Sequence, residues 1–238
     1  HRLYEQAVDI GDFEYAGYIG MMRSIFDFYT AEDLGQATTW ARHYAAAMEE
    51  SQQLNSLAVH GMVYQAMLNL IERTDDPVLL TGAVFDEPSM LAVFQKLNDP
   101  TCLFVIHCLK STLAAFHGRW RECVDLASTA ESYVSGATAT IHKVVMSQWS
   151  GLAAATLARS GAADREALLA RAEKALERLN AWAEQNPMTH GHRPGLVRGA
   201  LAAARGDRQA ALSELEATVT LARDHQSPAE LAVALRTA

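Results

Sequence analysis

The side chains of this 238-residue chain that are able to do chemistry fall into one acidic segment and two groups of histidine and cysteine. The acidic segment runs from Thr74 to Glu87 and includes Asp75, Asp76 and Asp86. Two carboxylates can act as general acid and general base, but turns and helix N-termini use the same residue types as capping groups. We interpret these carboxylates as turn and capping residues. The sequence therefore predicts no catalytic residue.

A metal site would have to be built from Cys102, His107 and Cys108, or from His190 and His192. Neither group provides four ligands at a spacing known from zinc sites. His107 and Cys108 are also neighbours on an expected helix, where adjacent side chains diverge by about a quarter turn or more. We predict no metal site, and we interpret the segment that begins at His190 as a mobile polar loop.

Motifs and charge argue against several other ligand classes. The chain has no Gly-x-x-x-x-Gly-Lys-Ser/Thr loop and no Gly-x-Gly-x-x-Gly motif, so we predict no nucleotide and no other cofactor. It carries 20 Lys and Arg against 28 Asp and Glu, without a basic run, which argues against nucleic acid as a partner. The longest apolar run, Cys102 to Leu109, is far shorter than the roughly 20 residues that cross a bilayer, so we expect no membrane segment.

Three cysteines, Cys102, Cys108 and Cys123, lie within apolar helical patterns. An odd number of cysteines at such positions suits buried thiols in a reducing compartment better than a disulfide framework. We therefore expect a cytoplasmic protein. Because the sequence starts at His1 within a helical pattern and shows no signal segment, we also expect it to be a fragment of a longer polypeptide.

Three residues are candidates for contact with a partner: Phe85, Asp86 and Trp182. Phe85 is an aromatic residue in a long turn, where it either plugs the stack of helices or offers a partner a handle, and we favour plugging. Trp182 belongs to a set of tryptophans with helical spacing, for which we favour the core over a groove between repeats. The set consists of Trp40, Trp120, Trp149 and Trp182.

Helical periodicity covers most of the chain and predicts an all-α protein. Alanine is abundant and proline is scarce, with 6 residues, which favours helix over sheet. We expect helices over about 13–29, 30–53, 54–73, 101–116 and 196–205, and further amphipathic stripes after Gly118, Gly136, Asp164, Gly206 and Ser227. Capping residues are expected at Thr30 with Asp33, at Asp99-Pro100, Asp164 and Asp207, and at Ser227 with Glu230.

Turns recur at a nearly constant interval. They are expected at Gly35, near Asp76, and at Gly118, Gly161 and Gly206, about 41 to 45 residues apart, which is the period of stacked two-helix units. Small residues lie seven positions before the last three glycines, as close contact within a hairpin requires: Ser111, Ala154 and Gly199. The sequence thus predicts a single α-solenoid domain over residues 1–238, made of about five stacked antiparallel helical hairpins.

The pattern resembles tetratricopeptide-type (TPR-like) repeats, in which a small residue precedes the turn glycine and another follows it by five positions, here Cys123 and Ala211. A second resemblance is to the helical-repeat region of very large bacterial signalling proteins. It rests on Asn69-Leu70-Ile71, on Asp75-Asp76-Pro77-Val78-Leu79-Leu80-Thr81-Gly82, on Phe85-Asp86-Glu87, and on Leu103-Phe104, Gly118-Arg119-Trp120 and Trp182-Ala183-Glu184.

The second resemblance covers essentially the whole chain and has implications for function. In that family a serine/threonine kinase and an AAA-like signal-transduction ATPase precede the repeats, and a GAF domain with a histidine kinase or cyclase follows them. The resemblance implies a non-catalytic regulatory module that contacts protein, either adjacent domains or a signalling partner. The alternative is a receptor for a small-molecule effector, similar to the helical-repeat sensor of the maltose-regulon activator.

Overall fold

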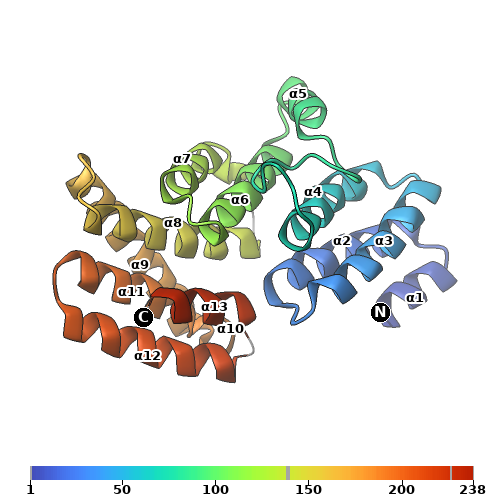
Figure 1. Cartoon of the computed structure of the whole chain (residues 1–238). Helices are drawn as coiled ribbons and strands as arrows, with labels where there is room; N and C mark the ends of the chain where they lie inside the picture. Colours follow the sequence, from blue (N-terminus) through green and yellow to red (C-terminus); the bar gives the residue numbers. More distant parts are fainter. Residues whose placement is uncertain (1, 138–139, 226, 238) are drawn as a thin grey trace.

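The computed structural model describes residues 2–137, 140–225 and 227–237, and within these ranges the regular structure is helical apart from one isolated β-bridge between Thr81 and Asp86. The prediction of an all-α protein is confirmed (Figure 1). In chain order the helices are α1 (Arg2–Asp9), α2 (Phe13–Thr30), α3 (Leu34–Glu50), α4 (Leu54–Ile71), α5 (Glu87–Leu97), α6 (Pro100–Phe116), α7 (Trp120–Glu131), the 3-10 helix η1 (Val134–Gly136), α8 (Ile141–Arg159), α9 (Arg165–Gln185), α10 (Pro187–His190), α11 (Arg193–Ala204), α12 (Arg208–Asp224) and α13 (Pro228–Thr237).

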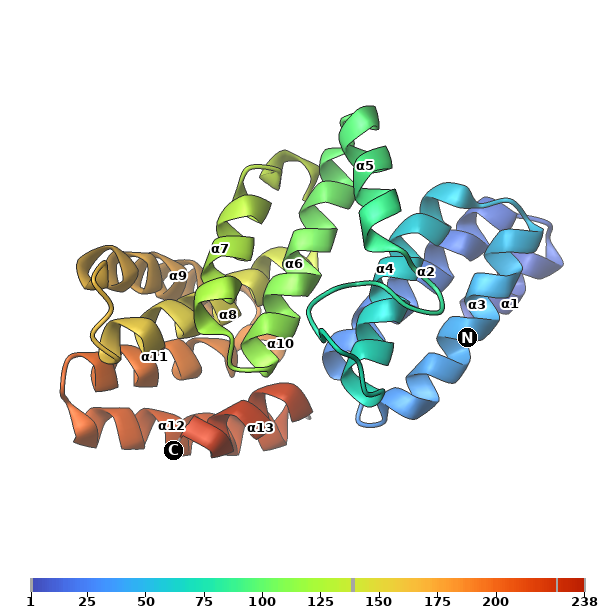
Figure 2. The ribbon, with the colours of Figure 1, turned by 45° about the horizontal axis from the view of Figure 1, so that its top comes forward.

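The helices alternate between two packing roles. One series, α2, α4, α6, α8, α11 and α13, packs each member against the next member. The helices α3, α7, α9 and α12 each pack both on the preceding member of that series and on the following one. The pattern is interrupted after α4. A loop over residues 72–86 takes the place of a tight turn, and the helix that follows it, α5, packs on α6 (Figure 2).

The C-terminal part of the chain returns to its N-terminal part. Helix α13 packs against α2 as well as against α11 and α12 (Figure 1). A buried apolar cluster runs from Ile25 of α2 through α4, α6 and α8 to Ala234 of α13. Trp149 is its largest fully buried side chain, and the ring of Phe116 meets it edge-on with centroids 5.1 Å apart. A smaller cluster joins α1 to α2 and α3.

Three of the predicted turn glycines are confirmed. Gly118, Gly161 and Gly206 connect consecutive helices with φ of +70°, +81° and +85°, a left-handed conformation in which a β-carbon is unfavourable. The turn expected at Gly35 is wrong, because this residue lies in the first turn of α3. The chain instead turns just before Asp33, whose carboxylate accepts a hydrogen bond from the Gln36 amide at 3.1 Å and so fixes the start of α3.

The predicted caps have mixed outcomes. Those at Asp99 and Asp207 are confirmed, because their carboxylates accept hydrogen bonds from the first amides of α6 and α12. The capping role of Thr30 is wrong, since Thr30 ends α2 and its hydroxyl donates to the Phe26 carbonyl at 2.9 Å. Asp164 directly precedes α9 as its N-cap residue, as predicted, but its carboxylate makes no capping hydrogen bond. Its carboxylate instead receives two hydrogen bonds of 2.7 Å from the Arg121 guanidinium, which ties the start of α9 to α7.

Small residues allow the two helices of a hairpin to approach closely, as the sequence predicts. The Ser111 hydroxyl on α6 donates to the Cys123 carbonyl on α7 at 2.9 Å. A β-carbon added to Gly199 on α11 would lie 3.1 Å from Cγ of Leu215 on α12. Both Ser111 and Gly199 are buried. Larger side chains at these two positions would therefore push α7 away from α6 and α12 away from α11.

Among the helices of the described ranges, none is both long enough and apolar enough to cross a bilayer.

Candidate functional site

The loop over residues 72–86 holds two of the predicted contact residues, and it is anchored to α4 and α6. Phe85 is 7% exposed, and its ring lies over Gly61 of α4. The Asn69 side-chain amide of α4 donates to the Pro77 and Leu79 carbonyls at 3.1 and 2.7 Å. Phe85 is thus part of the core, whereas Asp86 is exposed at the N-terminus of α5.

The carboxylates of the acidic segment do not converge on a common point. Glu87 is buried, and its carboxylate accepts a hydrogen bond from the Leu80 amide at 2.8 Å and pairs with Lys110. Asp76 is exposed and pairs with Arg119 at 2.7 Å. These contacts fix the loop to α6 and α7. The segment therefore has the structural role that turn and capping residues are expected to have.

Trp182, the third predicted contact residue, lies on α9, away from the loop that carries Phe85 and Asp86 (Figure 1). It is partly buried and packs against the main apolar cluster. The structure therefore does not bring the three residues together. Among the other tryptophans, Trp149 is fully buried, and Trp40 and Trp120 are partly buried.

The cysteines are buried and free, as the sequence predicts. Burial raises the pKa of Cys102 and of Cys123 to about 12, and it also raises the pKa of Cys108 well above the ordinary value of a thiol. The thiols are therefore protonated at neutral pH and unreactive as nucleophiles. No group of three His, Cys, Asp or Glu side chains suited to a metal ion occurs in the part of the chain that the structure describes.

A buried polar cluster joins α8, α11 and α13. The Arg193 guanidinium donates to Gln148 Oε1 at 2.7 Å and to Glu230 Oε1 at 2.6 Å. The side chains of Arg193 and Glu230 are 5% and 3% exposed. His192 Nε2 lies 3.2 Å from the Ser227 hydroxyl and 3.8 Å from Glu230 Oε1. The cluster fastens the last helix to the interior of the protein.

Two opposing effects set the pKa of Glu230. Burial alone would raise it, but the positive charge of Arg193 and the contact with His192 outweigh burial and lower the pKa to about 2. The carboxylate is thus ionised at neutral pH and forms a buried ion pair. Such a pair contributes little net stability, but removal of one partner is costly because the other charge is left buried.

This cluster overturns two predictions. The segment from His190 was expected to be a mobile polar loop, but His192 and Arg193 are only 3% and 4% exposed. The capping box of Ser227 with Glu230 is wrong because both side chains turn to α11, Ser227 to His192 and Glu230 to Arg193. One signal was present in the sequence, since Gln148 interrupts an otherwise apolar stripe on α8.

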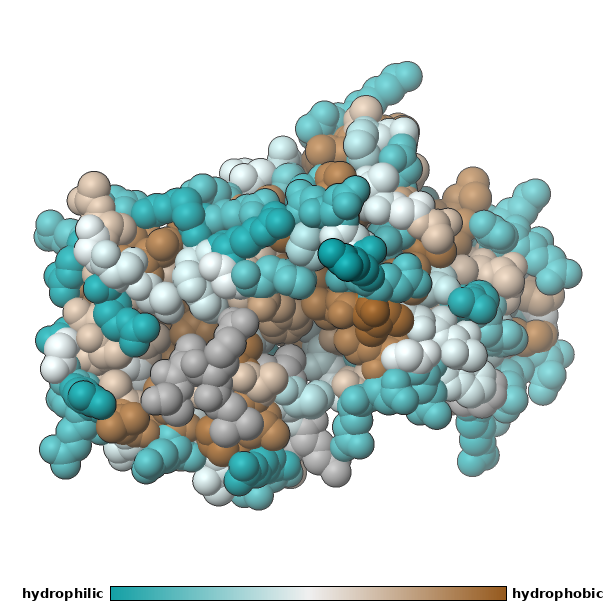
Figure 3. Space-filling model, in the orientation of Figure 1, coloured by the Kyte–Doolittle hydropathy of each residue, from teal (hydrophilic) through white to brown (hydrophobic). Residues whose placement is uncertain are grey.

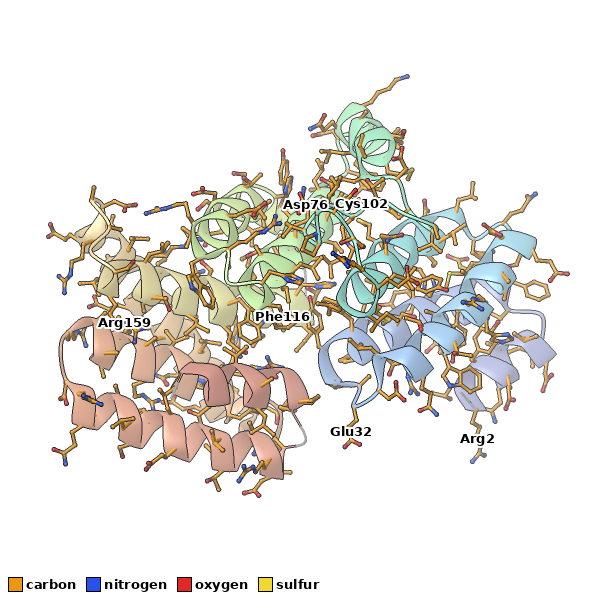
Figure 4. The ribbon with its side chains drawn as sticks, in the orientation of Figure 1. Arg2, Glu32, Asp76, Cys102, Phe116 and Arg159 are labelled. Atoms are coloured by element: carbon orange, nitrogen blue, oxygen red, sulfur yellow. The ribbon has the colours of Figure 1, made fainter. Side chains whose placement is uncertain are left out.

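A cavity with a volume of about 520 Å³ lies between α8, α11 and α12, and Trp120 of α7 also lines it. We call it the arginine groove, because Arg159 and Arg208 line it and no acidic residue does. Leu152 of α8, Leu196 of α11 and Leu215 of α12 supply apolar walls. Figure 4 shows Arg159 at the end of α8, beside the hairpin of α11 and α12.

The sequence of α11 explains why the arginine groove is hollow. The helix presents Gly199, Ala200 and Ala203 to the groove, and none of them has a side chain longer than a methyl group. Ala203 lies three residues after Ala200 and four after Gly199, so the three residues share one helical face. The leucines of α8 and α12 rise on both sides of this face, so a trough remains between them.

The two arginines of this groove are not engaged within the protein. The guanidinium groups of Arg159 and Arg208 make no hydrogen bond and no ion pair with another described residue, and both side chains are exposed. Arg205, which is also exposed, is paired with Glu173, and Arg198 is paired with Glu214. In a chain of net charge -8, two unpaired cations at one groove are a local reversal of sign.

A second cavity, of about 400 Å³, lies where α13 meets α2. We call it the seam groove. It is lined mainly by apolar side chains, among them Phe28 of α2, Leu70 of α4, Phe116 of α6 and Val233 of α13. Figure 3 shows a hollow near the centre of this face with apolar residues on one side, and Figure 4 places Phe116 at the end of α6 beside it.

Sequence reasoning missed Arg159, Arg208 and the cluster around Arg193 as candidate residues.

Comparison with known proteins adds no assignment: no family model matches the chain, and neither a curated protein nor a solved structure matches it.

Proposed function

We propose that this chain is a TPR-like α-solenoid of about five helical hairpins, forming one domain over residues 1–238 of a longer protein. The alternating packing supports this proposal. Helices α2, α4, α6, α8, α11 and α13 contact one another in order, and the intervening helices contact two successive members of the series, as in stacked two-helix repeats. The turn glycines Gly118, Gly161 and Gly206 support the same period.

The function that we propose is a non-catalytic regulatory and protein-interaction module of a bacterial, cytoplasmic signal-transduction protein. One observation carries it: α2 exposes an apolar stripe. Tyr15, Tyr18 and Phe26 are 56%, 51% and 47% exposed, and they lie within one face of the helix because their spacings are close to multiples of 3.6 residues. Exposed apolar patches on folded proteins mark interaction sites.

The neighbourhood of this stripe strengthens the proposal. Leu3, Ile10 and Phe13 are 65%, 80% and 49% exposed in the same part of the chain. Large exposed apolar side chains are thus concentrated on α1 and α2. We assign this surface to contact with adjacent domains of the same protein, whose output it regulates. Asp86 and Trp182 remain proposed additional contact residues.

The experiment compares the full-length protein with and without Tyr15→Ser and Tyr18→Ser. These exposed substitutions leave the apolar cluster intact, so the fold should persist. We expect a changed catalytic output of the full-length protein, because the contact between this module and its neighbours is weakened. Leu97→Ser is the control, since Leu97 is 69% exposed on α5, away from the stripe. Equal output from all variants would contradict the proposal.

A second candidate function is a receptor for a small-molecule effector. The arginine groove favours it, because a volume of about 520 Å³ lies within the range of roughly 300 to 1,000 Å³ typical of ligand pockets. A ligand that binds only the folded state raises the unfolding temperature according to its concentration relative to Kd. A thermal-shift screen of cellular metabolites tests this candidate, and the absence of any shift would count against it.

A further inference from the structure

The arginine groove has two chemically different ends. Arg159 is the last residue of α8 and Arg208 is the first residue of α12, so both cations belong to the ends of helices that meet the hairpin turn at Gly206. Leu152 and Leu215 lie seven residues further into the same two helices and are 1% and 6% exposed. A charged end and an apolar end are therefore about 10 Å apart along the helices.

The polar end suits an anion. A guanidinium presents donors in a fixed fork that matches the oxygens of a carboxylate or phosphate. Neither guanidinium has a partner among the described residues, so an anion would not have to displace an internal ion pair. The lining contains no carboxylate that would repel it.

The apolar part suits a hydrocarbon or aromatic body. Ala200 and Ala203 form a low floor, whereas Gly199 is covered by Leu215, and Leu212 is 39% exposed on one wall although it is an apolar residue. Trp120 adds an aromatic side chain to the lining. Leu152, Leu196 and Leu215 are already buried, so the apolar surface that a ligand would remove from water belongs mainly to Leu212 and to the partly buried Ala200 and Ala203.

We propose that the arginine groove binds a small amphiphilic anion. Its carboxylate or phosphate head pairs with Arg159 and Arg208, and its apolar body lies on Ala200 and Ala203 between the leucine walls. This site deepens the small-molecule function proposed above, and it does not depend on the apolar stripe of α2.

The test is titration calorimetry of the 238-residue chain with octanoate, octyl phosphate, octan-1-ol, octylamine and inorganic phosphate. We expect saturable binding of octanoate or octyl phosphate, and the stronger of the two identifies the head group. Octan-1-ol lacks the anionic head and inorganic phosphate lacks the apolar body, so each should bind at least about tenfold more weakly. Octylamine should not bind, because its charge has the wrong sign.

Chain length provides a second readout. Each methylene that becomes buried contributes about 0.8 kcal/mol, so affinity should rise roughly fourfold per methylene from hexanoate to octanoate. The rise should stop once the body exceeds the trough. A series without any dependence on chain length would overturn the role of the apolar walls.

Variants locate the site. Arg159→Gln and Arg208→Gln each remove one charge from an exposed side chain, and each should weaken octanoate binding by about tenfold while leaving the unfolding temperature unchanged. Ala203→Leu should block the trough. Arg223→Gln is the matched control, because Arg223 is exposed on the same helix as Arg208 but does not line the groove.

Three results would overturn the proposal: no saturable binding of either anionic amphiphile, equal binding of octan-1-ol, or full binding by both arginine variants. None of them would affect the proposed contact of α2 with adjacent domains. That contact is judged by the output of the Tyr15 and Tyr18 variants, so the failure of one proposal is distinguishable from the failure of the other.

Discussion

The Tyr29 hydroxyl lies 2.6 Å from Nδ1 of His142, although 113 residues separate them in the sequence. Tyr29 is on α2 and His142 is on α8, and both side chains are buried. Their rings also meet edge-on, with centroids 5.5 Å apart. This contact joins the N-terminal helices to the middle of the chain, near the place where α13 packs against α2.

Tyr29→Phe tests the contribution of this contact to stability. The substitution keeps the ring but leaves Nδ1 of His142 buried without a partner, which should cost about 1–3 kcal/mol of unfolding free energy. Urea denaturation measures the loss. Tyr15→Phe is the control and should have almost no effect, since Tyr15 is 56% exposed. A Tyr29 variant as stable as the unmodified chain would show that the contact contributes nothing.

Two buried histidines predict a loss of stability in acid. Burial lowers the pKa of His60 and of His142 from 6.5 to about 4. Because the pKa is lower in the folded state, the unfolded chain takes up protons first as the pH falls. The stability that each neutral histidine contributes is therefore fully present above about pH 6.5 and is lost as the pH falls towards 4, by roughly 3 kcal/mol per histidine.

The measurement is the unfolding free energy in urea between about pH 7 and pH 4.5. The double variant His60→Gln with His142→Gln should show a flatter pH dependence, whatever its stability at neutral pH. His43→Gln is the comparison, because His43 is not among the buried residues. An unchanged slope in the double variant would refute the assignment of the acid response to these two side chains.

The ion pair of Arg193 and Glu230 should behave as a coupled unit. Arg193→Met leaves the Glu230 carboxylate buried without its cation, so it should cost about 3–5 kcal/mol, and Glu230→Gln should also destabilise the protein. The double variant should lose less than the sum of the two single losses. Additive losses in a double-mutant cycle would contradict the coupling.

The exposed pair of Arg205 and Glu173 is a matched comparison for this cycle. Its side chains are 56% and 51% exposed, so solvent screens the interaction. Arg205→Met should therefore cost less than about 1 kcal/mol. A loss as large as that of Arg193→Met would mean that burial does not distinguish the two pairs.

Gly118→Ala tests the hairpin turn between α6 and α7. Gly118 has a φ of +70°, where a β-carbon costs about 1–2 kcal/mol, although the space around it is open. The loss should appear as a lower urea midpoint. Gly35→Ala is the comparison, because Gly35 lies in a helix and its φ carries no such cost, although the added β-carbon would lie 3.1 Å from Oδ1 of Asp33. Equal losses in the two variants would disagree with the assigned turns.

Local signals in the sequence predicted most of the helices and most of the turns, but not α5 or α10. Gly118, Gly161 and Gly206 follow apolar stripes and precede new ones, and no other residue adopts their backbone conformation as readily. The failure at Gly35 has a physical reason. Glycine is also tolerated in the first turn of a helix, and Asp33 is the stronger signal there because it caps α3.

Apart from Gln148 in the apolar stripe of α8, local patterns in the sequence did not indicate the buried polar cluster. His192 and Arg193 follow a helix break and carry polar side chains, which is typical of an exposed loop. They are buried because Glu230, 37 residues after Arg193, supplies a matching charge from α13. A single sequence contains no signal for this pairing, since it depends on how distant helices pack.

The arginine groove could not be predicted from the sequence for a similar reason. Its floor is small residues on α11, which the sequence explains by close packing within a hairpin. The space above such small residues is either filled by a neighbouring side chain or left open. Which of the two occurs depends on the side chains that α8 and α12 place beside it. Arg159 and Arg208 can be recognised as candidate binding residues only after the structure shows α8 and α12 packed beside α11.

Hydroxyl-radical footprinting of the proposed longer protein and of the 238-residue chain tests the central claim, that the apolar stripe of α2 contacts protein, most directly. In the isolated chain Tyr15, Tyr18 and Phe26 should be labelled in proportion to their exposure. In the full-length protein their labelling should fall severalfold, while Met188, which is 82% exposed, should be labelled equally in both. Equal labelling of the stripe in the two proteins would contradict the claim.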